Sequence, residues 1–237
     1  MGGQRQRTLQ PTKRRNDLRM RSVLCYGDSN TYGQTSADRP ADRFGPTERW
    51  PRLMSNHLGK QWLVIEEGLS GRTTVSDDPI EGAYRNGRTY LTPCLLSHRP
   101  LDAIILMLGT NDLKIRFNKP ASEIAMGVRA LIEDIATTDA GHDGRMPEVL
   151  LVSPPPVLKD LRGWEPVFAG AHEKSKDLAQ EYEKVADAME VHFFDAGGVV
   201  TSGTDDGFHL DLAGHSKLGE ALAAQIELIG WPETASR

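Results

Sequence analysis

Residues 23–30 read VLCYGDSN, and residues 103–112 read AIILMLGTND. Each stretch is a short apolar run, rich in branched side chains, that ends in a glycine followed by polar residues. Runs of this kind are typical of strands that are buried on both faces of a parallel sheet. The chain is therefore expected to form five strands, at residues 23–26, 63–65, 103–108, 149–152 and 191–194.

Longer amphipathic stretches lie between these runs and are predicted as helices. Strands that alternate with helices imply a parallel sheet, and right-handed crossovers place the helices on both of its faces. The sequence thus predicts an α/β fold, a three-layer α/β/α sandwich with a doubly wound, five-stranded parallel sheet in the order 2-1-3-4-5. Ligands bind such sheets at the carboxyl ends of the strands, here between the first and the third. The expected helices span residues 48–58, 89–97, 122–136, 171–189 and 212–229.

The length and the charge of the chain limit its possible domain organisation and its possible classes of partner. We expect a single domain over residues 20–237, preceded by a disordered basic extension at 1–19 that is a tag or an upstream start, with a basic docking arm as the alternative. This extension holds six of the 28 Lys and Arg and one of the 33 Asp and Glu, so the rest of the chain has a net charge of −10. An acidic body argues against nucleic acid as a partner. No apolar stretch is long enough for a bilayer, so no membrane partner is expected.

Cysteine and histidine usage argues against disulfides, metals and cofactors. Two cysteines occur, Cys25 and Cys94, which is too few for a disulfide framework and indicates a cytoplasmic location. Cys25 lies within the first strand and is interpreted as a buried structural thiol. The chain has no His-Glu-x-x-His, paired-cysteine or His-x-His motif and no glycine-rich phosphate loop after the first strand. We expect neither a catalytic metal nor a cofactor.

Ser29 is the candidate nucleophile. It follows Gly27 and Asp28 at the end of the first strand, where a turn into a helix would expose its hydroxyl at the edge of the sheet. The alternative is a serine that caps the helix, because such turns commonly carry one. Gly-x-Ser alone is a short signal that lacks the second glycine of the nucleophile elbow.

Two further turns could supply hydrogen bonds to an oxyanion. Asn111 follows the third strand, which is expected beside the first, and its amide could donate to developing negative charge. Gly71 follows the second strand and leaves room for its own N–H to approach a ligand. A plain turn would explain the sequence around Asn111 and the sequence around Gly71 equally well. Each residue therefore indicates an oxyanion hole only in combination with Ser29.

Asp206 and His209 are the candidate partners of Ser29. They lie three residues apart just before the last expected helix, so one turn brings carboxylate and imidazole together. A carboxylate on Nδ1–H fixes the tautomer and leaves Nε2 free to take the serine proton. His215 is the main rival for the base, and Asp195 and Asp205 are the alternative carboxylates.

These segments resemble four conserved blocks of the SGNH (GDSL-like) hydrolase family. The resemblance covers nearly all of the chain from Met20 onward. It implies a flavodoxin-like sandwich, metal-free ester hydrolysis by Ser29, His209 and Asp206, and an oxyanion hole made by the Ser29 N–H, the Gly71 N–H and the Asn111 side chain. The blocks fall, in the family's order, at residues 27–29, 71, 109–112 and 206–209.

Further stretches are similar to the arylesterase and acyltransferase (perhydrolase) branch, which includes carbohydrate acetylesterases. The branch implies a small acyl group, transfer to alcohols or peroxide besides water, and a homo-oligomer, with octamers among its members. Two features depart from it, Asn30 and the segment 158–168 with Trp164 and Phe168. The similar stretches are 27–33, 66–70, 77–79, 108–112, 153–156 and 193–197.

The sequence therefore predicts a serine esterase that hydrolyses acetyl or other short-chain esters of aryl alcohols or carbohydrates through an acyl-enzyme. Its partner is a small-molecule ester. The first alternative is a lysophospholipase or thioesterase with the same triad, which would need a continuous apolar groove for a long chain. The second is a non-catalytic α/β sandwich that binds sugar esters or nucleotides, in which Ser29 caps a helix and Asn111 shapes a turn.

Overall fold

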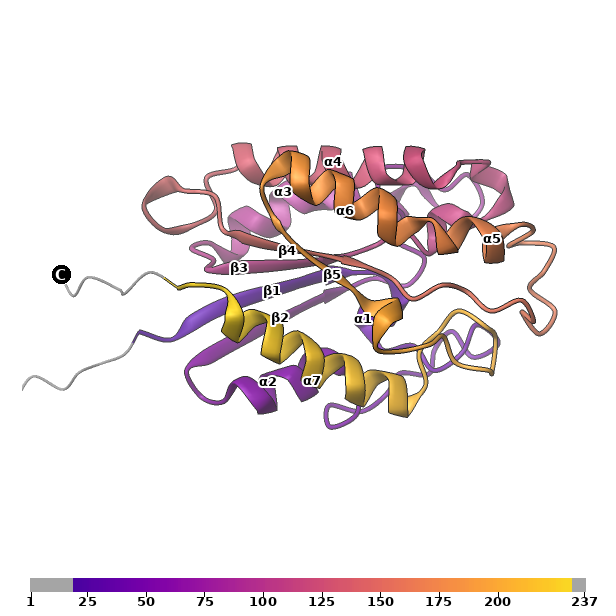
Figure 1. Cartoon of the computed structure of the whole chain (residues 1–237), viewed down its shortest axis with the longest axis horizontal. Helices are drawn as coiled ribbons and strands as arrows, with labels where there is room; N and C mark the ends of the chain where they lie inside the picture. The colour runs from indigo at the N-terminus through magenta and orange to yellow at the C-terminus, as the bar shows by residue number, and fades with distance from the viewer. Residues whose placement is uncertain (1–18, 232–237) are drawn as a thin grey trace, which may run out of the picture.

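The computed structural model describes residues 19–231, so the expected extension at 1–19 lies outside the described residues except for Arg19. Arg19 forms an ion pair with Asp102. Five parallel strands form one sheet in the order β2-β1-β3-β4-β5 (Figure 1), which confirms the predicted order. The strands are β1 (Arg21–Gly27), β2 (Trp62–Gly68), β3 (Ala103–Met107), β4 (Glu148–Ser153) and β5 (His192–Asp195).

Helices cover both faces of the sheet, as the pattern of alternating strands and helices predicts. Figure 1 shows α3, α4 and α6 on one face and α2 and α7 on the other. The α-helices of the described range are α1 (Ser29–Tyr32), α2 (Trp50–Leu58), α3 (Gly87–His98), α4 (Ala121–Thr137), α5 (Ala171–Lys176), α6 (Leu178–Met189) and α7 (Leu212–Leu228). Short 3₁₀ turns are η1 (Ala83–Arg85), η2 (Asn111–Leu113), η3 (Ile115–Phe117), η4 (His142–Gly144) and η5 (Ala196–Gly198).

The core lies in two layers, one on each side of the sheet. Successive side chains of a strand point to opposite faces, so Leu24 and Tyr26 of β1 pack with α3, α4 and α6, whereas Val23 and Cys25 pack with α2 and α7. Both sets are fully buried. Burial on both faces explains why the central strands are continuous apolar runs rather than alternating ones.

The expected elements form close to their predicted positions, with one clear difference. The helix predicted over 171–189 is two helices, α5 and α6, separated at Asp177. The N–H of Asp177 bonds to the carbonyl of Lys174, three residues back, which tightens the last turn of α5 and interrupts the regular helix. No helix within residues 19–231 has the length and apolar character needed to cross a membrane.

Candidate active site

The turn that carries Ser29 begins where β1 ends at Gly27. A Cβ at Gly27 would lie 2.8 Å from the carbonyl oxygen of Met107 and 2.0 Å from Oγ1 of Thr31, so the close approach of β1, β3 and α1 requires glycine. Asp28 then caps α1, because its carboxylate accepts a hydrogen bond of 3.0 Å from the N–H of Asn30. Ser29 is therefore the first residue of α1, at the carboxyl edge of the sheet.

The structure brings Ser29, His209 and Asp206 together in one hydrogen-bonded row. Oγ of Ser29 lies 2.8 Å from Nε2 of His209, and Nδ1 of His209 lies 2.6 Å from Oδ2 of Asp206. The three residues are nearly inaccessible to solvent. His209 comes from the loop between β5 and α7, which crosses back to the end of β1. This is the order of groups that proton transfer from a serine hydroxyl requires.

Backbone N–H groups fix the Asp206 carboxylate. Oδ1 accepts from the N–H groups of Phe208 (3.1 Å) and His209 (2.9 Å), and Oδ2 accepts from that of Ala37 (2.7 Å). Burial opposes ionisation of Asp206, but the hydrogen bond and charge of His209 and the backbone donors outweigh it and lower the pKa of Asp206 to about 2. An ionised Asp206 accepts the Nδ1 proton of His209, which leaves Nε2 to accept from Ser29.

Asn111 lies between the Ser29 turn and the loop that holds Gly71. Its amide nitrogen donates to the carbonyl oxygen of Arg72 (3.1 Å) and approaches Oδ2 of Asp28 at 3.4 Å. Gly71 precedes Arg72 and has a φ of +76°, in the left-handed region that favours glycine. The three groups predicted for an oxyanion hole thus lie on segments that contact one another, and their role as donors remains a prediction.

A buried carboxylate ties the loop after β3 to the loop after β2. Asp112 accepts from the N–H of Thr74 at 2.9 Å and from its hydroxyl at 2.6 Å. Burial raises the pKa of Asp112 to about 6, although the bonds from Thr74 act against this rise. Nothing in a Gly-Thr-Asn-Asp turn identifies a partner in a loop 38 residues away, so this role of Asp112 could not be predicted from the sequence.

Aromatic side chains form a wall beside His209. The ring of Phe208 lies 4.7 Å from that of His209, 4.6 Å from that of Phe168 and 6.1 Å from that of Trp164. Trp164 also donates to Asp38 at 3.3 Å. A pocket of about 380 Å³ next to this wall is lined by Asp38, Arg162, Gly163, Trp164, Pro166 and Val167.

The rival residues have other partners. Nδ1 of His215 accepts from the N–H of Trp50 at 3.2 Å, and burial lowers the pKa of His215 to about 3. Asp195 accepts from the hydroxyl of Ser153 and the N–H of Gly197, both at 2.9 Å. Asp205 forms an exposed ion pair with Arg39.

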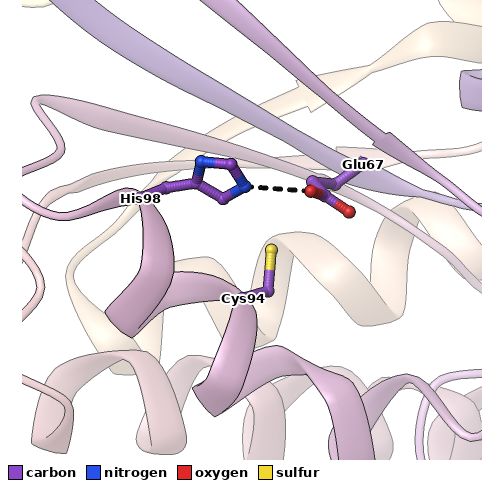
Figure 2. Close-up of side chains that lie close together, drawn as sticks. All are labelled: Glu67, Cys94 and His98. Atoms are coloured by element: carbon purple, nitrogen blue, oxygen red, sulfur yellow. Dashed lines mark hydrogen bonds and ion pairs between the residues drawn. The ribbon is translucent and has the colours of Figure 1, made fainter.

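One group of side chains within residues 19–231 has the composition of a metal site. Glu67 of β2 and Cys94 and His98 of α3 place their donor atoms within 4.8 Å of one another (Figure 2). Nε2 of His98 lies 3.0 Å from Oε1 of Glu67. Burial, with the nearby charge of Glu67, raises the pKa of the Cys94 thiol to about 12. The imidazole of His98 and the carboxylate of Glu67 satisfy each other and the Cys94 thiol is held protonated, so the hydrogen bond and the packing of α3 against the sheet explain their proximity. The other cysteine, Cys25, is a fully buried free thiol.

Besides the bonds of Asp112, two further contacts of the site could not be predicted from the sequence. The N–H of Ala37 is a backbone group, which no residue type reveals. In the sequence Asn30 is a departure from the arylesterase branch without a stated role, whereas in the structure its amide bonds on both sides of His209, to the carbonyl of Phe208 and the N–H of Leu210.

Comparisons with known proteins identify one matching family and several solved structures of similar fold. The model of the GDSL-like lipase/acylhydrolase family matches residues 25–217. The aryl esterase of M. smegmatis is similar in structure, with a TM-score of 0.83 and 41% sequence identity over 87% of this chain and 98% of that one. A carbohydrate acetylesterase from Sinorhizobium meliloti has a TM-score of 0.83 and 42% identity over 89% and 100%. A second carbohydrate acetylesterase family member from that organism has a TM-score of 0.81 and 36% identity over 88% and 98%. Curated proteins gave no significant match.

Proposed function

Because the chain belongs to the GDSL-like lipase/acylhydrolase family, and is thus a carboxylic ester hydrolase, we propose that Ser29, His209 and Asp206 are its catalytic triad. The observation that carries this proposal is the unbroken row of contacts, 2.8 Å from Ser29 to His209 and 2.6 Å from His209 to Asp206.

In the proposed reaction, Oγ of Ser29 attacks the ester carbonyl carbon while Nε2 of His209 takes the hydroxyl proton. The charge that develops on the carbonyl oxygen is stabilised by the N–H groups of Ser29 and Gly71 and by the side chain of Asn111. When the C–O bond to the alcohol breaks, His209 returns the proton to the leaving oxygen. Water or a second alcohol, deprotonated by His209, then attacks the acyl-enzyme. The ester bond to Oγ of Ser29 breaks, and His209 returns the proton to Oγ, which restores the free enzyme.

The proposed substrates are acetyl and other short-chain esters of aryl alcohols or carbohydrates, with transfer of the acyl group to alcohols or peroxide as a further activity. The aryl esterase and carbohydrate acetylesterases that this chain resembles at 36 to 42% identity support this choice. The pocket beside Trp164 also supports it, because an aromatic ring flanked by Asp38 and Arg162 combines an apolar surface with hydrogen-bonding groups.

A panel of esters tests the proposal. Wild type and Ser29→Ala are compared on acetyl, butyryl and longer acyl esters of one phenol and of one sugar and on the corresponding acyl thioesters, with and without an added alcohol. We expect activity to fall as the acyl chain lengthens, to depend on Ser29, and to yield a new ester when alcohol is present. A maximum at long acyl chains or with thioesters would favour a lysophospholipase or thioesterase instead.

Labelling with an organophosphate separates an enzyme from a binding protein. The proposal requires one covalent adduct per chain at Ser29, absent in Ser29→Ala. A folded protein that binds esters but forms no adduct would support the non-catalytic alternative.

Assembly and location complete the proposal. We propose a homo-oligomer, supported by the resemblance to the arylesterase branch and by exposed apolar side chains such as Ile80 (75% exposed) and Tyr84 (61% exposed). Its solution mass, measured by light scattering, tests this directly. We propose that the protein is cytoplasmic, which its two buried free cysteines support. We also propose that the chain forms a single domain from residue 20 onward.

A further inference from the structure

Asn30 follows Ser29 in α1, and its side chain points away from solvent toward the loop that carries His209. Nδ2 of Asn30 donates to the carbonyl oxygen of Phe208 at 3.1 Å, and Oδ1 accepts from the N–H of Leu210 at 2.8 Å. Only 2% of Asn30 is exposed. One side chain therefore uses both its donor and its acceptor on the main chain of another segment.

The two bonded residues are the immediate neighbours of His209 in the chain. Apart from the contact of Ser29 with His209, these are the hydrogen bonds between α1 and residues 206–210 in the part of the chain that the structure describes. Two bonds from one planar amide restrict both the distance and the rotation of the backbone that they hold. Asn30 therefore links the helix that carries Ser29 to the main chain on either side of His209.

The chemistry of this position is specific to an asparagine. Asp has the same shape but no N–H to donate, Leu fills a similar volume without any polar atom, and Gln is longer by one methylene group. Removing the amide would also leave the carbonyl of Phe208 and the N–H of Leu210 without partners in a buried place.

We propose that Asn30 is a positioning residue that holds His209 at the proton-transfer distance from Ser29, an inference that rests on the proposed triad. Asn30 touches main-chain atoms of the His209 loop and is almost inaccessible, so its loss affects the catalytic step and leaves substrate binding largely unchanged. A misplacement of about 1 Å in an active site can lower a rate by about 10²-fold.

Two variants remove the amide in different ways. Asn30→Leu retains volume and Asn30→Ala avoids any steric conflict, so at least one should fold. For each we expect kcat to fall by about 10-fold to 100-fold with KM within about twofold of wild type. Both constants are measured on an aryl acetate, alongside the melting temperature.

Ser175→Ala is the matched control. Ser175 is buried, and its hydroxyl accepts from the N–H of Val157 at 3.1 Å and donates to the carbonyl of His172 at 2.9 Å. The control therefore also removes one donor and one acceptor to the main chain, but away from Ser29 and His209. We expect it to lower the melting temperature as much as the Asn30 variants do while keeping kcat near wild type.

A double-mutant cycle with His209→Ala decides whether Asn30 acts through His209. Triad variants retain measurable activity over water, about 10³-fold to 10⁴-fold in other serine hydrolases. We expect Asn30→Leu, or Asn30→Ala if the former does not fold, to have no further effect on kcat when His209 is already absent. An equal loss in both backgrounds, or an unchanged kcat in the single variants, would overturn the positioning role.

The cycle also separates this inference from the proposed triad. If His209→Ala keeps wild-type activity, the triad itself is wrong. If His209→Ala is impaired and the Asn30 variants are not, the triad stands and the role of Asn30 alone is rejected.

Discussion

Nε2 of His209 lies 2.8 Å from the hydroxyl of Ser29, although the two residues are 180 positions apart in the chain. β1 and its turn fix Ser29, and the hydrogen bonds of Asp206 fix the loop that carries His209. The nucleophile and its base are thus in contact without any movement of the chain. A site assembled in advance should respond to the loss of any one of its members with a fall in kcat rather than a rise in KM.

Replacement of Ser29 by alanine should lower kcat on an aryl acetate by at least about 10³-fold, because the covalent step is lost. Ser202→Ala is the control, since Ser202 is also buried and its hydroxyl donates to the carbonyl of Pro156. Steady-state hydrolysis, with circular dichroism to verify the fold, measures both. If folded Ser29→Ala retains more than a tenth of wild-type activity, another residue is the nucleophile.

Asp206→Asn should retain the shape of the site but place the wrong tautomer of His209 toward Ser29. The amide of an asparagine at position 206 donates to Nδ1 of His209, so the ring proton moves to Nε2. A protonated Nε2 can no longer accept the proton of Ser29. We expect kcat to fall by about 10³-fold to 10⁴-fold. Asp205→Asn is the matched variant, because Asp205 is the exposed neighbour that pairs with Arg39. If the two variants lose activity equally, Asp206 has no special role.

The arrangement of the sheet could be predicted from the sequence because each strand is an apolar run that ends in a turn signal. The topological rule for doubly wound sheets then placed the turns after β1 and β3 at one edge. The pairing of Asp206 with His209 was also predictable, since three residues in a turn bring side chains together. These signals are local in sequence or follow from the topology of the fold.

The contacts that complete the site could not be predicted in this way. The bond from the N–H of Ala37 to Asp206 uses the main chain, so any residue other than proline would serve. The bonds of Asn30 to the His209 loop and of Asp112 to Thr74 depend on the paths of loops that have no periodic pattern. The break between α5 and α6 occurs at Asp177, within an amphipathic stretch that reads as continuous.

Asn111→Ala tests the predicted oxyanion donor. Loss of a donor of this type lowers kcat by about 10²-fold to 10³-fold, because the hydrogen bond strengthens as charge develops on the substrate oxygen. We expect KM to change little. Asn111→Asp should be equally impaired despite its similar shape, since an ionised carboxylate cannot donate. A rise in KM at constant kcat in Asn111→Ala would instead indicate that Asn111 binds the ground state.

His215 should make the stability of the protein depend on pH. The pKa of His215 is about 3 in the folded protein, where burial disfavours the charged form, against 6.5 for a histidine exposed to solvent. Below pH 6.5 the unfolded chain therefore binds a proton that the folded protein does not, and the free energy of unfolding falls as the pH drops from 6.5 toward 3. Asp28 and Asp112, whose pKa values burial raises to about 6, act in the opposite direction. Both carboxyl groups are present in wild type and in His215→Gln, a variant whose side-chain oxygen can still accept from Trp50. The difference in stability between the two proteins therefore isolates His215.

Urea unfolding at pH 7, 6, 5 and 4 should show wild type losing stability relative to His215→Gln, by up to about 1.4 kcal/mol per pH unit well below pH 6.5. A difference that stays constant across this range would mean that His215 titrates equally in the folded and unfolded states.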